Sequence, residues 1–312
     1  MHVFNNLNEV DIRKTVVTMG TFDGLHCGHR LIINQLLQKA KSVRKPSMVI
    51  TFEPHPRLVL QNNIQNLKLL TEKDEKISLL AEMGVDYLLI LPFTYEFSQQ
   101  TSIEFIENYL IVGLGISSMV IGYDHRFGRA DEQPSDVATL LQERGIDVER
   151  IRQHDIEDVA VSSTKIRKAL ADGEIQIANK LLGYAYSMSG AVIHGYKIGR
   201  KLTFPTANIL LRNNLKLIPS DGVYAVEVKY RMKWYKGMMN IGHRPTFGMD
   251  QKALEVHILN FDEIIYGEFL TIRFIEKIRN EIVFNGPEEL RIQLQKDKEI
   301  VEQIFGGKID PQ

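Results

Sequence analysis

A glycine-rich stretch of ten residues, Gly20 to His29 (GTFDGLHCGH), constrains the fold of this chain more than any other part of it. An apolar run, Thr15 to Met19, precedes it. Apolar residues at helical spacing follow it: Ile32, Ile33, Leu36, Leu37 and Ala40. This order predicts a strand, a tight turn and the first turn of a helix. A helix start offers free N–H groups and partial positive charge to a phosphate, and His26 and His29, three residues apart, lie on one side of it.

The glycines of this stretch fit an ordinary turn of an α/β protein as well as a phosphate site. The sequence His26-Cys27-Gly28-His29 is more specific. It resembles the nucleotidyltransferase signature, in which both histidines contact the phosphates of a nucleoside triphosphate. The stretch lacks the Gly-x-x-x-x-Gly-Lys-Ser/Thr pattern of a P-loop, so that interpretation is excluded for it.

The rest of the first half alternates short apolar runs with helical stretches. The further predicted strands are 47–52, 87–91, 118–122 and 146–151, and the further predicted helices are 72–83, 102–110 and 134–144. The runs are continuously apolar, which is typical of strands buried on both faces. The pattern therefore predicts an α/β domain with a doubly wound, Rossmann-like parallel sheet.

Polar clusters follow three of these strands. They are Asp23, His26 and His29 after the first strand, Glu53 and His55 after the second, and Asp124, His125 and Arg126 after the fourth. Ligands of such sheets bind beyond the carboxyl ends of the strands, so the three clusters together indicate one site. Taken singly, His55 and His125 fit ordinary loop residues equally well.

The segment Ser162-Ser163-Thr164-Lys165-Ile166-Arg167 allows two interpretations. Ser and Thr are good helix starters, so the segment fits a simply capped helix. The alternative is a mobile clamp, in which hydroxyls and cations at a helix start close on a triphosphate.

The composition changes near Gly183. Period-two and β-rich stretches then cover 184–193, 223–230, 233–241, 254–259 and 270–278. With no helical pattern between them, they predict an antiparallel sheet or a small barrel, and a helix over 287–305 closes the chain. We therefore expect two domains, 1–183 and 184–312.

Two short patterns of the second half carry chemistry. In an extended chain Thr206 and Asn208 point to the same side, and a hydroxyl with an amide oxygen suits Mg²⁺. The alternative is a Pro-Thr turn that enters a strand. Glu255 shares a strand face with His257, and a carboxylate there could accept the proton of a hydroxyl that attacks a γ-phosphate.

Motifs of both halves resemble the bacterial bifunctional riboflavin kinase/FAD synthetases. In the first half they are Gly20–His29, Thr51–Pro56, Gly122–Gly128 and Ser162–Arg167. In the second half they are Pro205–Asn208, Asn240–Phe247 and Glu255–His257, with Phe261-Asp262 and Tyr266-Gly267-Glu268 following. The resemblance covers nearly the whole chain. It implies an FMN adenylyltransferase (FAD synthetase) domain over 1–183 and a riboflavin kinase barrel over 184–312, which convert riboflavin to FMN and FMN to FAD.

The resemblance also implies residue roles. ATP contacts are implied for Gly20, Phe22, Asp23, Gly24, His26, Gly28, His29, Ser162, Ser163, Thr164 and Arg167. Asp124 would contribute to the flavin pocket, and Thr206 and Asn208 would bind Mg²⁺. Glu255 would be the catalytic base of the kinase, while His29 and Arg167 would serve adenylyl transfer by neutralising phosphate charge. The implied partners are ATP, riboflavin, FMN and FAD, with Mg²⁺ as cofactor.

The chain departs from the family pattern at two places. Thr203 stands where the family usually has glycine, and a β-branched residue stiffens the backbone where phosphates approach. Arg129-Ala130-Asp131-Glu132 is acidic where many relatives are basic and glycine-rich, so that loop receives no role. Three alternatives stay open: an enzyme with one active half, a cytidylyltransferase-like enzyme with another phosphate acceptor, and a non-catalytic flavin-binding or RNA-binding regulator.

Composition narrows the class of partners. A chain of 312 residues has room for two domains, and a net charge of −1 gives no field that attracts nucleic acid or an acidic membrane. The single tryptophan, Trp234, also weighs against RNA. One cysteine, Cys27, excludes an internal disulfide, and with no secretory signal or apolar span we expect a cytoplasmic protein.

Overall fold

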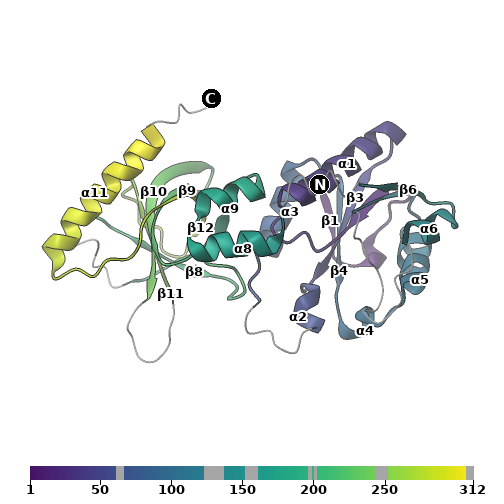
Figure 1. Ribbon diagram of the computed structural model, residues 1–312, viewed down its shortest axis with the longest axis horizontal. Coiled ribbons are helices and arrows are strands. Elements are labelled where there is room, and N and C mark those ends of the chain that lie inside the picture. The colour runs from purple at the N-terminus through teal and green to yellow at the C-terminus, as the bar shows by residue number, and fades with distance from the viewer. Residues whose placement is uncertain are drawn as a thin grey trace. The chain divides into compact units, whose positions relative to one another are not determined.

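The computed structural model describes residues 1–60, 67–122, 137–151, 161–195, 199, 202–243 and 252–306. The chain divides into two compact units, Met1–Ser163 and Thr164–Gln312 (Figure 1). The domain boundary that the sequence predicts, after Gly183, coincides with the end of helix α9 (Ile175–Leu182) and stays a prediction. No helix of the described residues is both long and apolar enough to cross a membrane.

A parallel sheet of six strands forms the centre of the first unit. The strands are β1 (His2–Phe4), β2 (Val16–Met19), β3 (Ser47–Glu53), β4 (Tyr87–Pro92), β5 (Ser118–Ile121) and β6 (Asp147–Arg150). They lie in the order β1-β4-β3-β2-β5-β6, and every neighbouring pair is parallel. The strands predicted from the sequence are present. β1 was not predicted, because three residues show no readable period.

Helices cover both faces of this sheet, since alternate strand residues enter two separate apolar clusters. Val16 and Leu88 enter the cluster that contains residues of α1 (Cys27–Val43) and α3 (Lys73–Glu82). Val17 and Leu89 enter the other cluster. It also contains residues of α5 (Ser102–Phe105), the π-helix η3 (Ile106–Gly113) and α6 (Val137–Gln142). The doubly wound parallel sheet is confirmed. The remaining short helices of the described part are η1 (Leu7–Glu9), α2 (Pro56–Leu60) and α4 (Tyr95–Ser98).

The strand order reverses at β2, which has β3 on one side and β5 on the other. The chain first runs outward from β2 through β3 and β4, and it then returns to place β5 on the opposite side. In open α/β sheets a ligand binds at the carboxyl ends of the strands where the order reverses. The stretch Gly20–His29 leaves β2 at this point, so the fold places the predicted phosphate turn where a ligand is expected.

A closed barrel of six antiparallel strands forms the second unit. The strands are β7 (Ser187–Ile193), β8 (Ala207–Leu211), β9 (Gly222–Tyr230), β10 (Lys233–His243), β11 (Lys252–Ile258) and β12 (Phe269–Arg279). Their order is β10-β11-β8-β7-β12-β9, and β9 pairs with β10 to close the ring. Helices α8 (Ser163–Asp172) and α9 precede the barrel in the chain, and α11 (Pro287–Gly306) follows it. The predicted small barrel and closing helix are confirmed.

A buried ion pair fixes α11 to the barrel. Arg279 of β12 donates hydrogen bonds from Nε and Nη2 to the carboxylate of Asp297, at 3.0 and 2.7 Å. Gln293, one turn earlier on α11, donates to the same carboxylate at 2.8 Å. The Asp297 side chain is completely buried, so its charge requires these partners. The pair therefore sets the position of the helix over the barrel strands.

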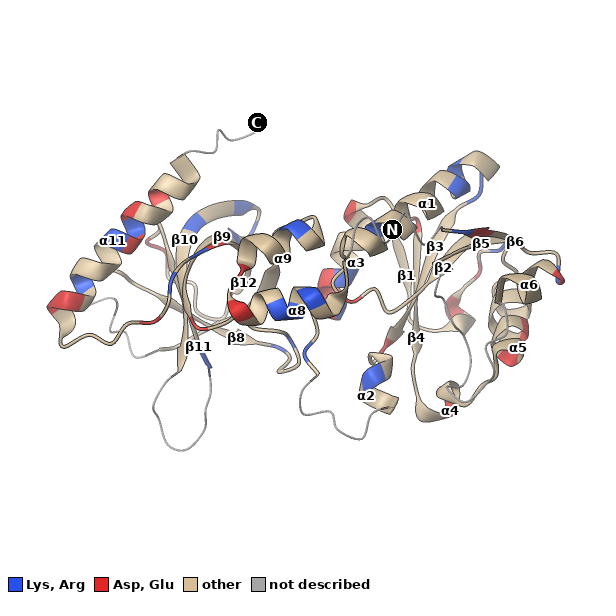
Figure 2. Ribbon diagram, viewed as in Figure 1, with Lys and Arg blue, Asp and Glu red and all other residues tan. Residues whose placement is uncertain are grey.

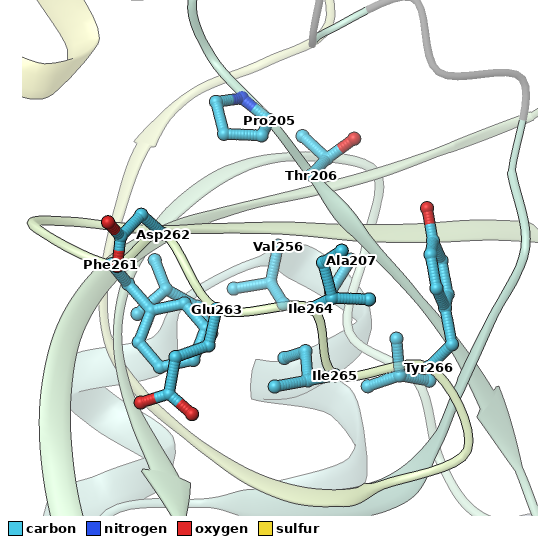
Figure 3. Close-up of a pocket in the computed structure, with 12 residues that line it drawn as sticks. Pro205, Thr206, Ala207, Val256, Phe261, Asp262, Glu263, Ile264, Ile265 and Tyr266 are labelled. Atoms are coloured by element: carbon cyan, nitrogen blue, oxygen red, sulfur yellow. The ribbon is translucent and has the colours of Figure 1, made fainter.

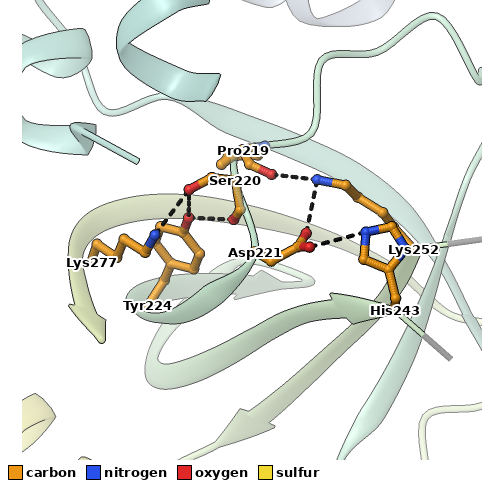
Figure 4. A network of polar contacts seen from close by, with 7 residues as sticks. All are labelled: Pro219, Ser220, Asp221, Tyr224, His243, Lys252 and Lys277. Atoms are coloured by element: carbon orange, nitrogen blue, oxygen red, sulfur yellow. Dashed lines mark hydrogen bonds and ion pairs between the residues drawn. The ribbon is translucent and has the colours of Figure 1, made fainter. Parts of the chain in front are cut away.

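A polar network joins the segment 219–221 to the barrel strands β9 to β12 (Figure 4). The Asp221 carboxylate lies 3.0 Å from both His243 Nε2 and Lys252 Nζ, which come from β10 and β11. The neighbouring Ser220 donates its backbone N–H to the carbonyl of Leu170 in α8 at 3.0 Å. Helix α8 carries a part of the predicted phosphate clamp, and these contacts hold its end against the barrel.

Candidate active sites

The first candidate site is the turn between β2 and α1, which has an unusual backbone. Phe22, Gly24 and Leu25 have φ angles of +48°, +86° and +38°. Glycine adopts such angles easily, whereas Phe22 and Leu25 hold them in full burial. A Cβ on Gly20 would lie 3.2 Å from the Phe22 ring. The turn is thus a strained and tightly packed element, of the kind that the surrounding fold must hold in place.

Asp23 connects this turn to the segment before α3. Its Oδ1 accepts hydrogen bonds from the backbone N–H groups of Leu70 at 2.9 Å and Thr71 at 3.1 Å. The Thr71 hydroxyl accepts a further bond from the N–H of Gly24 at 3.0 Å. The buried carboxylate therefore orders the backbone of the turn. Its contact with ATP stays a prediction.

The two histidines of the turn lie together. His26 is the N-cap of α1, and its Nδ1 accepts a hydrogen bond from the backbone N–H of His29 at 3.3 Å. The two rings stack, with centroids 3.7 Å apart and an interplanar angle of 14°. The buried Nδ1 of His29 has no hydrogen-bond partner among the described residues. In a neutral His26 this bond places the hydrogen on Nε2, so His26 offers an Nε2–H donor beside the ring of His29.

Acid is expected to destabilise the first unit through His29. Burial, and then the charges of His26 and Lys76, lower the pKa of His29 well below its usual value of about 6.5. As the pH falls below that value, the unfolded chain binds a proton at His29 that the folded chain does not, and this favours unfolding. Between about pH 7 and pH 5, the free energy of unfolding, measured with denaturant, should fall less in His29→Gln than in the parent. Equal slopes of unfolding free energy against pH in the two proteins would contradict a neutral His29 imidazole in the folded chain.

The structure places the other predicted residues of this site as follows. Gly28 is buried in the first turn of α1. Ser163, the first residue of α8, donates its hydroxyl to the carbonyl of Asp23 at 3.0 Å and so contacts the turn. Ser162 precedes it, and Thr164 and Arg167 lie on α8 in the second unit, in a run of basic residues that Figure 2 shows in blue. Asp124, His125 and Arg126 lie outside the described residues, as does the loop 129–132.

Lys76 of α3 is a charged group of this site that the sequence interpretation did not single out. Its Nζ donates to the carbonyl of Thr21 at 2.7 Å and to the hydroxyl of Thr51 at 3.3 Å. The residue is only 8% exposed. Its spacing in the sequence could have indicated its burial, because Lys76 lies four residues before the buried Leu80 and hence on the apolar face of the helix.

The second candidate site is built on β8 and β11 of the barrel. The Thr206 hydroxyl contacts Oε2 of Glu255 at 3.5 Å. Asn208 pairs with Glu255 in the ladder between the two strands, so their side chains lie on the same face. His257 Nδ1 lies 2.8 Å from the carbonyl of Pro205, which fixes the strand entry before Thr206. The structure thus brings Glu255 to Thr206 and Asn208, from which it is far away in the sequence.

Two cavities meet at Thr206, which lines both. Side chains of β11 alternate, so Val256 and Ile258 face the first cavity, whereas Glu255 and His257 face the second. The first has a volume of about 340 Å³, and Figure 3 shows Pro205 and Thr206 across it from the segment 261–266. The second has a volume of about 270 Å³. Its apolar wall includes Leu202, Phe204, Ile282, Phe284, Leu290 and Leu294.

Thr203 adopts a φ of +66°, the conformation that favours glycine. The departure noted in the sequence therefore lies at a strained position of the loop before Thr206.

We expect Thr203→Gly to raise the stability of the second unit by about 1 kcal/mol, since relief of strain exceeds the entropy that glycine adds to the unfolded chain. Denaturant unfolding measures this. The same replacement at Thr271, which is extended in β12, should destabilise, and a loss of stability in both variants would refute strain at Thr203.

Both halves of the chain match known families. Residues 8–165 match the family model described as FAD synthetase, and residues 182–305 match the one described as riboflavin kinase. Relatives named bifunctional riboflavin kinase/FMN adenylyltransferase include a Listeria monocytogenes protein, which is 40% identical over 95% of this chain and 93% of its own length. The Escherichia coli K12 protein is 37% identical over 97% of this chain and 96% of its own length.

The fold also has a full-length counterpart among solved structures. A Streptococcus pneumoniae chain described as a macrolide-efflux protein is 29% identical, with a TM-score of 0.85 over 96% of this chain and 98% of that one. Its description differs from both family models, and the likeness supports the fold. Two family models in series, and relatives that are similar over their full length, show that the chain belongs to the bifunctional riboflavin kinase/FMN adenylyltransferase family.

Proposed function

We propose that this chain phosphorylates riboflavin to FMN in its second unit and transfers AMP from ATP to FMN in its first. The observation that carries the proposal is that the chain matches the bifunctional family over its full length, and each unit contains a candidate site for phosphate. The first is the histidine turn at the switch point of the parallel sheet. The second is the carboxylate of Glu255 beside two cavities in the barrel.

In the kinase half, Glu255 is the proposed base. The 5′-hydroxyl of riboflavin attacks the γ-phosphorus of ATP, its proton passes to the carboxylate, and ADP leaves. The base must face the acceptor, so riboflavin belongs in the cavity that Glu255 lines, where apolar side chains suit a flat ring. ATP then belongs in the cavity beside the segment 261–266, and the transferred phosphoryl group passes near Thr206, which borders both.

Thr206 and Asn208 fit a magnesium ion. Mg²⁺ prefers oxygen ligands, and it bridges to the phosphates of a nucleotide, whose charge it neutralises. The Asn208 side chain is 8% exposed and lies directly against Gly195, where a Cβ would clash with its amide. Its orientation toward the face of Glu255 is therefore fixed by packing. Glycine at position 195 leaves the space that this orientation needs.

Removal of the metal is expected to stop FMN formation. We expect EDTA to abolish it and added Mg²⁺ to restore it, as measured by chromatography of the flavins. Asn208→Ala should raise the Mg²⁺ concentration for half-maximal rate about tenfold or more, because one oxygen ligand is lost. Asn214→Ala, an exposed change just after β8, serves as the control. An unchanged Mg²⁺ requirement in Asn208→Ala would exclude Asn208 as a ligand.

In the adenylyl-transfer half, the phosphate of FMN attacks the α-phosphorus of ATP and pyrophosphate leaves. The Nε2–H groups of His26 and His29 and the N-terminal amides of α1 offer donors to the triphosphate. Thr164 and Arg167 of α8 are proposed to bind phosphate as well, through a hydroxyl and a guanidinium group. No covalent enzyme intermediate is needed, because positioning and charge neutralisation account for both reactions.

With one cysteine in the chain, we also propose a cytoplasmic location.

Two parallel incubations test the proposal. The purified chain receives ATP and Mg²⁺ with riboflavin in one tube and with FMN in the other, and the flavins are then separated. FMN followed by FAD in the first tube supports both activities. FAD from supplied FMN alone would leave an adenylyltransferase with an inactive kinase half. No product in either tube would overturn the proposal and favour a flavin-binding protein or another acceptor.

A further inference from the structure

Lys76 is a buried lysine that the proposed reaction does not yet use. It lies on α3, and it is one of few charged side chains in the described residues that are almost fully buried. Burying an amine away from water is costly unless it forms hydrogen bonds or meets opposite charge. The packing of the helix alone therefore does not explain a lysine at this buried position.

The contacts of Lys76 all lead to the phosphate turn. Its Nζ and the Thr51 hydroxyl both donate to the carbonyl of Thr21, at 2.7 and 3.3 Å. Thr51 in turn accepts from Nζ at 3.3 Å, which closes a three-membered network. Thr21 lies directly between β2 and the strained residue Phe22. Lys76 thereby holds the first peptide groups of the turn against the carboxyl end of β3.

Charged and titratable groups surround this amine on three elements. Asp23 of the turn and Glu53 at the end of β3 favour its charged form, whereas burial disfavours it and lowers the pKa of Lys76. On the side of α1, the charge of Lys76 acts on His29, which stacks on His26. The pKa of His29 is lowered well below its usual value, so its imidazole is neutral at neutral pH, and Lys76 is a charged side chain among the described residues that can supply positive charge to a triphosphate.

We infer that Lys76 is a positioning residue of the adenylyl-transfer site, which holds the start of the phosphate turn and supplies positive charge beneath the bound triphosphate. The inference rests on the proposed adenylyl transfer. It adds a residue outside the histidine motif and outside α8. Lys76 acts through Thr21 and through its field, and it leaves direct phosphate contact to the histidines and the amides of α1.

The test is the kinetics of FAD formation from FMN at varied ATP. Lys76→Met keeps the length of the side chain and removes the amine. We expect it to raise KM for ATP about 10- to 100-fold, with a smaller change in kcat. Lys73→Met is the matched control, since Lys73 lies one turn away on the same helix, is exposed and contacts Asn5. FMN formation by the same protein reports whether the second unit is folded and active.

Two further variants separate a positioning role from a purely structural one. Lys76→Arg keeps a charge that cannot be lost, so it should retain most of the affinity for ATP. We expect KM for ATP to rise at alkaline pH in the parent and not in Lys76→Arg. Thr51→Val removes one partner of Nζ and should raise KM for ATP about two- to fivefold. This variant keeps the test decisive if Lys76→Met does not fold.

The outcomes are distinct. If the parent makes no FAD from FMN, the proposed adenylyl transfer fails, whatever Lys76 does. If the parent is active and folded Lys76→Met has the parent KM for ATP, or lower stability alone, the inference is overturned. The inference would also be overturned if Thr51→Val had the same KM for ATP as the parent, or if KM for ATP still rose at alkaline pH in Lys76→Arg.

Discussion

Glu255→Gln is expected to lose FMN formation by about 10²- to 10⁴-fold in kcat, because an amide cannot take the proton of the attacking hydroxyl. The change is isosteric, so the ladder between β8 and β11 and the contact with Thr206 should persist. KM for riboflavin should change little, since the apolar wall of the second cavity is untouched. The measurement is steady-state FMN production with riboflavin, ATP and Mg²⁺.

The same preparation provides its own control. FAD formation from supplied FMN occurs in the other unit and should remain at the parent rate. Glu227→Gln is a second control, because Glu227 is a carboxylate of β9 that lines neither of the two cavities described above. Parent-rate FMN production in Glu255→Gln would exclude Glu255 as the base. A loss in both reactions would indicate misfolding.

The sequence predicted the fold well wherever one local pattern decided the structure. The continuous apolar runs at 47–52 and 87–91 became central strands because both of their faces meet helices. The period of two in the second half became barrel strands for a related reason, since one face of each strand is interior. β8 was less readable, because its entry at Thr206 resembles a turn after proline and its partners β7 and β11 are far away in sequence.

The sequence can indicate candidate site residues only where they lie in a compact motif, and their roles stay predictions. The pair His26 and His29 is local, so its stacked geometry follows from the start of α1. Lys76 was missed because its partners Thr21 and Thr51 lie on other elements, and a lone lysine on a helix normally faces solvent. The cavities at Thr206 likewise depend on strands, the segment 261–266 and α11, which no single stretch contains.

His29→Ala is expected to reduce FAD formation from FMN by about 10²- to 10³-fold while FMN formation continues at the parent rate. The reason is the loss of an Nε2–H donor at the start of α1, where negative charge is concentrated on the triphosphate. The main change should be in kcat/KM for ATP, measured with FMN saturating. Loss of both activities in a folded variant would contradict the independence of the two sites.

Two further replacements identify the atom responsible. In His29→Gln the amide nitrogen can occupy the place of Nε2, whereas in His29→Asn it occupies the place of Nδ1, which is buried and without a partner among the described residues. If Nε2–H is the donor, the Gln variant should retain about tenfold more activity than the Asn or Ala variant, as one retained hydrogen bond to a charged group predicts. Equal activity of Gln and Asn would reject the proposed Nε2–H donor of His29. Higher activity of Asn would assign the contact to Nδ1 and require the ring to turn in the complex with ATP.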